Sequence, residues 1–245
     1  MVRVSRPYVV LSVATSVDGY IDDASDRRLV LSGAADLDRV DAERASVDAI
    51  LVGATTIRRD DPRLLVRSPE RVARRVAAGR APQPVKVTIS GGGDLDPGAR
   101  FFTTGDTTRI VYVPSGVAVP DALRAVATVV STGSPLDPAR VLADLHGRGV
   151  ERLMIEGGTT VHTLFLTAGL VDEIQLAVAP FFVGDPAAPR VVGPGVFPHD
   201  ARRRMRLAGV TQLDDVVLLR YLLDGAVRGS AQRPSDPAGH REGRR

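Results

Sequence analysis

Residues 152–168 read RLMIEGGTTVHTLFLTA. The short apolar run at 152–155 is typical of a buried strand, and the pattern at 159–168 is typical of a helix. A Glu-Gly-Gly turn stands between them. Strand, glycine turn and helix in this order predict one unit of an α/β sheet, with a polar loop at the carboxyl end of its strand.

The same alternation runs through most of the chain. Apolar, β-rich runs predict further strands at residues 8–14, 49–53, 85–90, 109–113 and 127–131. Helical patterns occupy residues 34–45, 54–59, 121–125 and 137–147. Asp121 and Asp137 are expected to be N-caps, and Gly149 is expected to stop the last of these helices. The rhythm predicts a mainly parallel sheet with helices on both faces.

The pattern changes after residue 170. A strand at 173–179 is followed by a Pro/Gly-rich loop and then by apolar runs at 205–212 and 216–222, which flank Asp214-Asp215 and predict an antiparallel hairpin. We therefore expect one mixed α/β domain over residues 1–224. The Arg-, Gly-, Ser- and Pro-rich tail at 225–245 is expected to be disordered.

Composition narrows the class of protein. The 245 residues include 44% apolar and 25% charged residues and no cysteine, which excludes disulfides and zinc sites with sulfur ligands. The four histidines show no metal-ligand spacing. The whole net charge of +3 comes from the Arg-rich tail, and the rest of the chain is formally neutral, so we expect no nucleic-acid partner. Since no apolar run approaches the roughly 20 residues that cross a bilayer, we expect a metal-free cytoplasmic protein with no membrane contact.

Three polar loops directly follow predicted strands, at residues 14–19, 53–62 and 156–160. Because the carboxyl ends of parallel strands meet at one edge of a sheet, we expect these loops on one rim, where open α/β sheets bind ligands. The sequence has no P-loop, nucleophile elbow or G-x-G-x-x-G motif, which disfavours ATPase, hydrolase and standard Rossmann functions.

Two glycine-rich turns are candidate nucleotide contacts. At Gly157-Gly158 the backbone can approach a diphosphate, and the helix that starts at Thr159-Thr160 offers free N–H groups. The alternative is a tight turn in which Thr159 only caps the helix. The second turn is Gly91-Gly92-Gly93, which could admit the adenosine end of a nucleotide, with Ser90 as a partner of a 2′-phosphate. The alternative there is a flexible surface turn.

Four charged residues are candidates for a functional site, and each of them also has an ordinary structural interpretation. Glu156 could orient a ligand or transfer a proton, or it could face solvent at the end of a strand. Asp60 begins Asp60-Asp61-Pro62, which normally stops a helix. Arg44 and Arg67 could grip a phosphate through paired hydrogen bonds, or they could be ordinary surface arginines.

Taken in order, these segments resemble the reductase domain of bacterial bifunctional riboflavin-biosynthesis proteins and its stand-alone relatives, over about residues 6–223. This resemblance implies the dihydrofolate-reductase-like α/β fold. Its landmarks are Arg6-Pro7-Tyr8-Val9, Ser16-Val17-Asp18-Gly19, Leu31-Ser32-Gly33, Arg44-Ala45, residues 48–53, Asp60-Asp61-Pro62, residues 64–67, Ile155-Glu156-Gly157-Gly158, residues 169–173 and Ala179-Pro180.

The resemblance implies an NADPH-dependent reductase that acts on a small molecule. A phosphoribosylaminopyrimidine would open at its ribose C1′ to an imine and accept a hydride, which gives the ribitylamino product. Relatives are commonly homodimers, so a homodimer is expected. The family's cofactor contacts, taken together with the glycine-turn residues discussed above, give the expected cofactor site. Its residues are Ala14, Gly53, Thr56, Asp60, Ser90, Gly157, Gly158, Thr159 and Thr160. The substrate contacts are Ser32, Arg44, Leu64, Arg67 and Glu156, and the catalytic candidates are Asp60 and Glu156.

Two positions depart from the family pattern. Ser12 stands where many relatives have Lys, and Val30 stands where many have Trp. These departures leave open a related reductase of dihydrofolate, a pterin or another heterocycle. A third alternative is a non-catalytic module that binds NADPH, because a fold alone does not guarantee activity.

Overall fold

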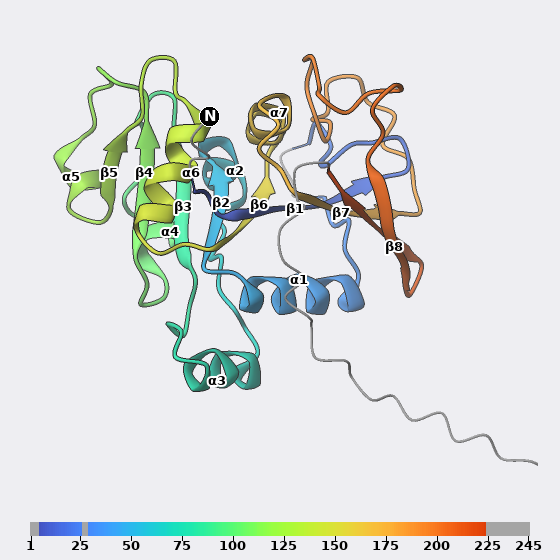
Figure 1. Cartoon of the computed structure of the whole chain (residues 1–245), viewed down its shortest axis with the longest axis horizontal. Coiled ribbons are helices and arrows are strands. Elements are labelled where there is room, and N and C mark those ends of the chain that lie inside the picture. The colour runs from blue at the N-terminus through green and yellow to red at the C-terminus, as the bar shows by residue number, and fades with distance from the viewer. Residues whose placement is uncertain (1–4, 26–28, 224–245) are drawn as a thin grey trace, which may run out of the picture.

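The computed structural model describes residues 5–25 and 29–223, so the predicted tail lies outside the described residues. Within that part of the chain a nine-stranded sheet is flanked by helices (Figure 1). The strands are β1 (Tyr8–Ser16), β2 (Ala49–Gly53), β3 (Val85–Ile89), β4 (Arg109–Val113), β5 (Thr128–Ser131), β6 (Arg152–Gly157), β7 (Glu173–Ala179), β8 (Arg206–Leu213) and β9 (Val216–Leu222). The helices are α1 (Ala34–Ser46), α2 (Ala54–Asp60), α3 (Pro69–Ala77), α4 (Arg100–Thr103), α5 (Asp121–Arg124), α6 (Pro138–Gly147) and α7 (Thr159–Thr167).

The strand order is β5-β4-β3-β2-β6-β1-β7-β9-β8. Every neighbouring pair from β5 to β7 is parallel, whereas β9 runs antiparallel to β7 and β8 antiparallel to β9. The mixed, mainly parallel sheet with a C-terminal antiparallel hairpin is therefore confirmed. The hairpin turns at Asp214, which adopts a positive φ of 55°, as a short polar residue tolerates in a tight turn.

Helices cover both faces of the sheet, as expected, because both faces are apolar along the central strands. All five residues of β2 are buried. On one face, Val9, Leu11 and Val13 of β1 pack with α6 and α7. On the other face, Ile50 and Val52 of β2 pack with α2, α4 and α5. Strands buried on both sides read as continuous apolar runs, which is why they were predictable from sequence.

Five of the seven helices were predicted within a residue or two. Asp137 caps α6 as expected, since its side chain accepts a hydrogen bond from the Ala139 N–H. Gly149, with φ of 86°, follows the end of that helix. The expectation for Asp121 is wrong, because Pro120 is the N-cap and Asp121 lies inside the first turn of α5.

Helices α3 and α4 were not predicted. The signal for α3 is present in the sequence, because Ser68 caps the helix through the Arg71 N–H and Pro69 follows at the first helical position. Its apolar stripe is short, so periodicity alone does not reveal it. Helix α4 has four residues, which is too short for a periodic pattern.

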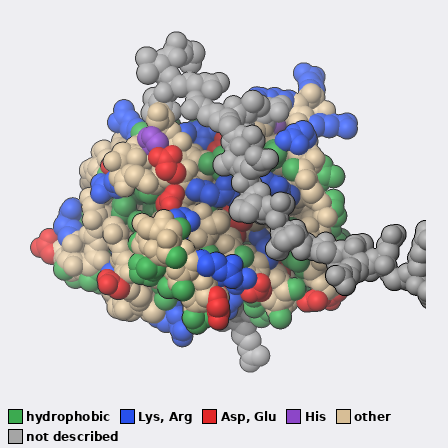
Figure 2. Space-filling view, turned by 60° about the horizontal axis from the view of Figure 1, so that its bottom comes forward, with side chains coloured by type: hydrophobic (Ala, Val, Ile, Leu, Met, Phe, Trp, Pro, Cys, Tyr) green, Lys and Arg blue, Asp and Glu red, His purple; other side chains and the backbone are tan. Residues whose placement is uncertain are grey.

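The surface shown in Figure 2 mixes acidic and basic side chains. Within residues 5–25 and 29–223, no helix has the length and apolar character needed to cross a bilayer. In the same residues, no cluster of three or more His, Cys, Asp or Glu side chains could hold a metal ion.

The start of β1 is held by a buried carboxylate. Asp172, just before β7, accepts two hydrogen bonds of 2.6 and 2.7 Å from the Arg6 guanidinium and one of 2.8 Å from the Val9 N–H. Its side chain is only 4% exposed. The pair thus joins two neighbouring parallel strands at their amino ends.

We predict that Asp172→Ala lowers the free energy of unfolding by about 3 kcal/mol, because it leaves a guanidinium and a buried N–H without their partner. The measurement is urea denaturation followed by circular dichroism. The control is Asp38→Ala, which removes the exposed partner of Arg71 and should cost less than about 1 kcal/mol. Equal losses in the two variants would contradict the prediction.

Candidate functional site

The three polar loops lie on one rim, as the parallel order of β2, β6 and β1 requires. A Cβ placed on Gly158 would be 3.4 Å from the Thr56 Oγ1 atom, and one placed on Gly53 would be 3.8 Å from the Gly158 N atom. The second and third loops are therefore in contact. The backbone of these glycines approaches so closely that a larger residue at Gly53 would press on Val161 at 3.0 Å.

Residues 189–191 join the first loop to the third. The Val191 N–H donates to the Gly19 carbonyl at 3.1 Å, and the Thr159 hydroxyl donates to the Arg190 carbonyl at 2.5 Å. The Arg190 guanidinium lies over the Tyr20 ring and donates to its hydroxyl at 2.7 Å. The rim is thus a continuous structure rather than three separate turns.

The Gly157-Gly158 turn has the properties of a diphosphate cradle. Gly157 has a φ of 142°, which favours glycine, and its peptide bond to Gly158 is cis. Gly158 is the N-cap of α7, and within residues 5–25 and 29–223 no side chain caps the helix. Because Thr159 bonds to Arg190 instead, the interpretation of Thr159 as the helix cap is wrong. The first turn of α7 therefore has N–H groups that no capping side chain satisfies, as anion binding at a helix N-terminus requires.

The His162 side chain packs against this turn. The side chain is fully buried, and its Nδ1 lies 2.8 Å from the Val191 carbonyl. Since a carbonyl oxygen only accepts, Nδ1 carries the hydrogen. The other ring nitrogen, Nε2, has no hydrogen-bond partner among the residues that the structure describes, and it lies 3.8 Å from where a Gly157 Cβ would be. Burial lowers the pKa of His162 to about 4, so the ring is neutral at neutral pH.

Arg44 and Glu156 form the central ion pair of the rim. The Arg44 Nε and Nη2 atoms each donate to one carboxylate oxygen of Glu156 at 2.7 Å, and Nη1 donates to the Leu65 carbonyl at 3.2 Å. Burial opposes the charge on Arg44, but the paired Glu156 carboxylate outweighs it, so the pKa of the guanidinium is raised. Arg44 and Glu156, which were both predicted as substrate contacts from distant parts of the sequence, therefore bind each other directly.

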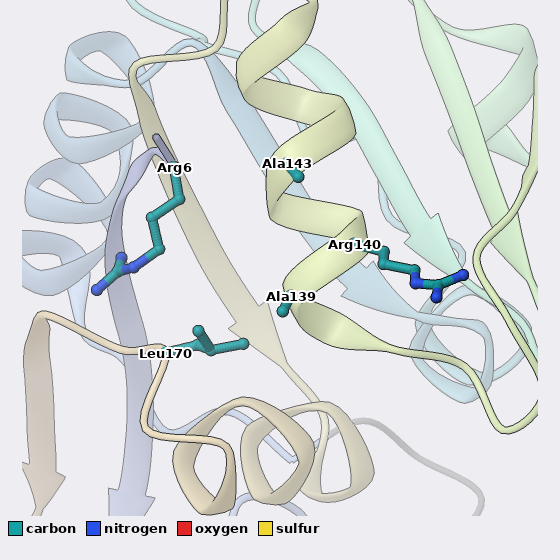
Figure 3. Close-up of a pocket in the computed structure, with 5 residues that line it drawn as sticks. All are labelled: Arg6, Ala139, Arg140, Ala143 and Leu170. Carbon is teal, nitrogen blue, oxygen red and sulfur yellow. The ribbon is translucent and has the colours of Figure 1, made fainter. Parts of the chain in front are cut away.

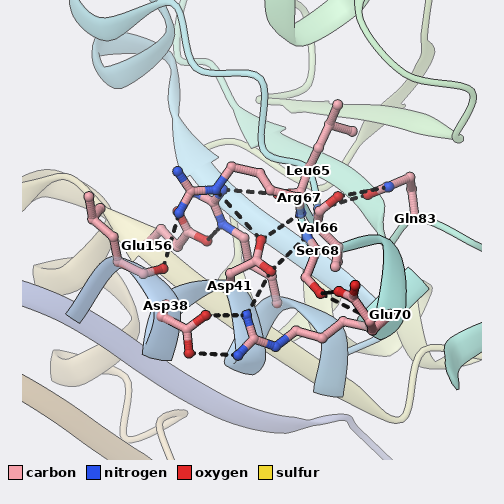
Figure 4. A network of polar contacts seen from close by, with 12 residues as sticks. Asp38, Asp41, Leu65, Val66, Arg67, Ser68, Glu70, Gln83 and Glu156 are labelled. Atoms are coloured by element: carbon pink, nitrogen blue, oxygen red, sulfur yellow. Dashed lines mark hydrogen bonds and ion pairs between the residues drawn. The ribbon is translucent and has the colours of Figure 1, made fainter. Parts of the chain in front are cut away.

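Arg67 is positioned through its backbone. Asp41, which is buried, accepts from the Arg67 N–H at 2.6 Å and from the Ser68 N–H at 3.1 Å (Figure 4). The Arg67 side chain is 60% exposed and donates to the Leu37 carbonyl at 3.1 Å. The buried Asp41 thus holds the loop through these N–H groups, and it also pairs with the largely exposed Arg67 guanidinium, whose Nε lies 3.7 Å from the carboxylate.

Comparison with known proteins places this geometry in a family. The family model described as "RibD C-terminal domain" matches residues 7–219. The chain belongs to the RibD C-terminal domain family. The expectation of a riboflavin-pathway reductase domain is therefore confirmed at the level of the family.

Two relatives and one solved structure illustrate the match. The chain is 37% identical over 190 residues to a protein of Archaeoglobus fulgidus, covering 76% of this chain and 86% of that protein. It is 36% identical over 225 residues to one of Methanothermobacter thermautotrophicus, covering 90% and 100%. Both are named 2,5-diamino-6-ribosylamino-4(3H)-pyrimidinone 5′-phosphate reductase. The structure of Acinetobacter baumannii RibD has a TM-score of 0.72 at 28% identity and covers 89% of this chain and 58% of that one. The dihydrofolate-reductase-like fold of this family is thus confirmed.

Not every predicted residue presents its side chain to the rim. The Ser90 hydroxyl is buried and accepts from the Gly93 N–H at 3.0 Å, so a ligand at this turn would meet backbone first. The Leu64 side chain belongs to the core below α2, and its φ is 48°. Asp60 is the last residue of α2, and the next residue, Asp61, binds Arg100 through its carboxylate.

A cavity of about 300 Å³ lies elsewhere, at the amino end of β1. It is lined by Arg6, Ala139, Arg140, Ala143 and Leu170 (Figure 3). Ala14 and the first loop are at the opposite end of β1, and the other two loops are at the corresponding ends of β2 and β6. We therefore base the candidate site on the geometry of the rim and its polar groups rather than on this apolar cavity.

Sequence analysis missed several residues that hold the site together. They are Asp41, His162 and Arg190, with Asp36 and Arg39 on α1. One signal was available in the sequence, because the helix at 34–46 reads AADLDRVDAERAS and has no continuous apolar stripe; the structure shows that its buried positions are Asp36, Asp41 and Glu43. A helix that buries charge rather than apolar side chains suggests a polar layer beneath it.

The buried His162 predicts a pH-dependent stability. Its pKa is about 4 in the folded protein and about 6.5 in the unfolded chain, so the unfolded chain binds the proton more tightly. Stability from this group is complete above pH 6.5 and falls by about 3 kcal/mol as the pH drops to 4. In urea unfolding between pH 4.5 and 7.5, His162→Gln should flatten the slope of stability against pH that the wild type shows. An unchanged slope in His162→Gln would contradict the prediction.

Proposed function

We propose that this protein is an NADPH-dependent reductase of 2,5-diamino-6-ribosylamino-4(3H)-pyrimidinone 5′-phosphate, which it converts into the ribitylamino product. The observation that carries the proposal is the Arg44–Glu156 pair beside the uncapped Gly157-Gly158 turn. This arrangement puts polar side chains that can contact a substrate next to a helix N-terminus that can bind an anion. The named relatives whose length this chain nearly spans support the choice of the undeaminated pyrimidinone.

The rim suits the cofactor in two respects. The first turn of α7, with Gly157 and Gly158, fits a diphosphate, and Thr56 lies close enough to Gly158 to add a hydroxyl. We assign Ala14, Gly53 and Asp60 to the same cofactor site, together with Thr159, Thr160 and the turn at Ser90. When bound, NADPH supplies the hydride that reduces C1′ of the opened ribose. In our proposal the neutral His162 holds the α7 end of this site without adding charge.

We assign substrate binding to the part of the rim that lies beside α1. Arg67 at the surface and Arg44 beneath it provide guanidinium groups for the phosphate, and Ser32 and the backbone of Leu64 complete the set. Glu156 accepts two hydrogen bonds from Arg44, which suits a carboxylate that orients the amino groups of the ring. Reduction of C1′=N requires one proton at nitrogen, and we assign its delivery to Asp60, because Glu156 is held as a carboxylate by Arg44.

We further propose a cytoplasmic homodimer. The edge strand β8 exposes Leu207 and Val210, with 51% and 58% of each residue accessible. An unpaired edge with apolar side chains is suited to a two-fold symmetric contact. Analytical ultracentrifugation should show a dimer for the wild type and a monomer for Val210→Lys.

The function is tested by the decay of NADPH absorbance with a panel of substrates. The panel holds the diaminopyrimidinone phosphate, its deaminated form and dihydrofolate, each with NADPH or NADH. We expect turnover with the diaminopyrimidinone and NADPH. Turnover with dihydrofolate alone would overturn the proposed substrate, and binding of NADPH without turnover of any compound would favour a non-catalytic module.

Glu156→Gln should lower kcat/KM about 100-fold, because the amide cannot accept both hydrogen bonds of Arg44 and also bind ring amino groups. Steady-state kinetics with the diaminopyrimidinone measure the loss. The matched control is Glu151→Gln just before the other end of β6, where Glu151 is 75% exposed. A loss of less than threefold in Glu156→Gln would exclude Glu156 from the site.

A further inference from the structure

Helix α1 faces the sheet with charged residues. Asp36, Arg39 and Glu43 are spaced i, i+3 and i+7, which places them on one side of the helix. Asp36 and Glu43 are buried, and the Arg39 side chain is 14% exposed. Helices that cover sheets normally present an apolar stripe. A polar layer therefore separates this part of α1 from β1 and β7.

Arg39 is the centre of that layer. Its Nε atom donates to Asp36 at 2.7 Å, and its Nη1 atom donates to the Gln175 Oε1 atom of β7 at 2.7 Å. Nη1 also lies 3.3 Å from the Ser12 Oγ atom of β1. Ser12 and Gln175 are paired positions on the neighbouring strands. Arg39 thus spans from the helix to two strands of the sheet.

The groups around Arg39 are themselves held in place. Gln175 donates to Glu43 at 3.1 Å and to Glu173 at 3.0 Å. Arg220 grips both oxygens of Glu173, and Arg152 donates to Glu43 at 3.0 Å. Three carboxylates and three guanidinium groups therefore balance in the layer, and Arg39 could not turn away without leaving a buried charge unpaired.

The Asp36–Arg39 pair gives opposite hydrogen-bond polarity to two serines. The Ser32 hydroxyl donates to Asp36, whereas the Ser12 hydroxyl accepts from Arg39. A serine hydroxyl has one hydrogen and two lone pairs. Ser32 has given its hydrogen to Asp36 and offers lone pairs, and Ser12 keeps its hydrogen available to a further acceptor.

Ser12 lies on the face of the sheet that carries Glu156. Val9, Leu11 and Val13 point to the α6 and α7 side, so Ser12 points to the α1 side. Glu156 is on the neighbouring strand β6 and pairs with Arg44 of α1, so it points to the same side. The donor of Ser12 and the carboxylate of Glu156 therefore share one face.

We propose that the Asp36–Arg39 pair determines substrate specificity by fixing Ser12 as a donor and Ser32 as an acceptor. This inference rests on the proposed function and deepens it. A pyrimidinone offers a ring carbonyl oxygen to Ser12, and its amino or ribosyl groups offer hydrogens to Ser32. A heterocycle with the opposite order of donors and acceptors would face two unsatisfied hydroxyls and bind more weakly. Arg39 and Asp36 are positioning residues that act through the serines.

The test is a double-mutant cycle on Ser12 and Arg39, read as KM and kcat with the diaminopyrimidinone and NADPH. Ser12→Ala removes the donor with little disturbance, and we expect it to raise KM about tenfold, as loss of one hydrogen bond does, with kcat reduced less than threefold. Arg39→Met should raise KM by a similar factor. The double variant should be no worse than Arg39→Met alone, because both changes remove one interaction. Arg39→Lys should recover part of the loss.

A matched control separates specificity from stability. Asp172→Asn weakens the Arg6–Asp172 ion pair, which holds β1 at the amino end of the strand. It should lower the melting temperature and leave KM unchanged at a temperature where the protein is folded. The proposal would be overturned if KM of the double variant rose by the product of the two single-variant factors. It would also be overturned if KM were unchanged in Ser12→Ala.

Wild-type kinetics distinguish failure of the inference from failure of the proposed function. If the wild type turns over the diaminopyrimidinone, the cycle judges the inference directly. If it does not, the proposed substrate is wrong. The same variants are then compared by the melting-temperature shift that dihydrofolate and the deaminated pyrimidine produce. Equal shifts for the wild type, Ser12→Ala and Arg39→Met would then overturn the specificity role, and shifts lost in both variants would support it.

Discussion

Parallel pairing of β2, β6 and β1 is the constraint on which the other features depend. These strands are buried on both faces, so their backbone groups must be satisfied within the sheet and their side chains must be apolar along most of their length. Parallel strands end at the same edge, and apart from Ser12 the polar residues of these three strands lie at or near the strand ends. The loops after β1, β2 and β6 therefore meet, and the sheet brings Gly53, Thr56 and Gly158 into contact.

The layer under α1 shows a different balance of forces. A charged layer between a helix and a sheet, in which Asp36, Glu43 and Glu173 are buried, contributes less stability than an apolar contact of the same size would, since each buried ion must lose its water. The charges are matched one to one, and Gln175 connects the carboxylates. Such a layer fixes hydrogen-bond direction, which an apolar contact cannot do. This property is what a site that distinguishes between similar heterocycles needs.

The positive side chains of the rim lie together beside α1, since Arg44 belongs to that helix and Arg67 donates to its Leu37 carbonyl. Arg44 is tied to Glu156, Arg67 is held through the buried Asp41, and the α7 N-terminus stays free of a capping side chain. His162 adds a polar contact without charge, because burial keeps the ring neutral.

The sequence by itself determined the strands, most helices and the C-terminal hairpin. Continuous apolar runs, caps and glycines act over a few residues and leave a local pattern, which is why β2 and the Gly157-Gly158 turn were recognisable. Only the tertiary structure decided the partners of the charged residues. Arg44 meets Glu156 and Arg39 meets Gln175 across more than a hundred residues of chain. The inward face of Ser90 and the bond from Thr159 to Arg190 were likewise decided by neighbours from other elements. A hydrogen bond depends on distance and direction in space, and local sequence carries neither for groups that only the completed sheet brings together.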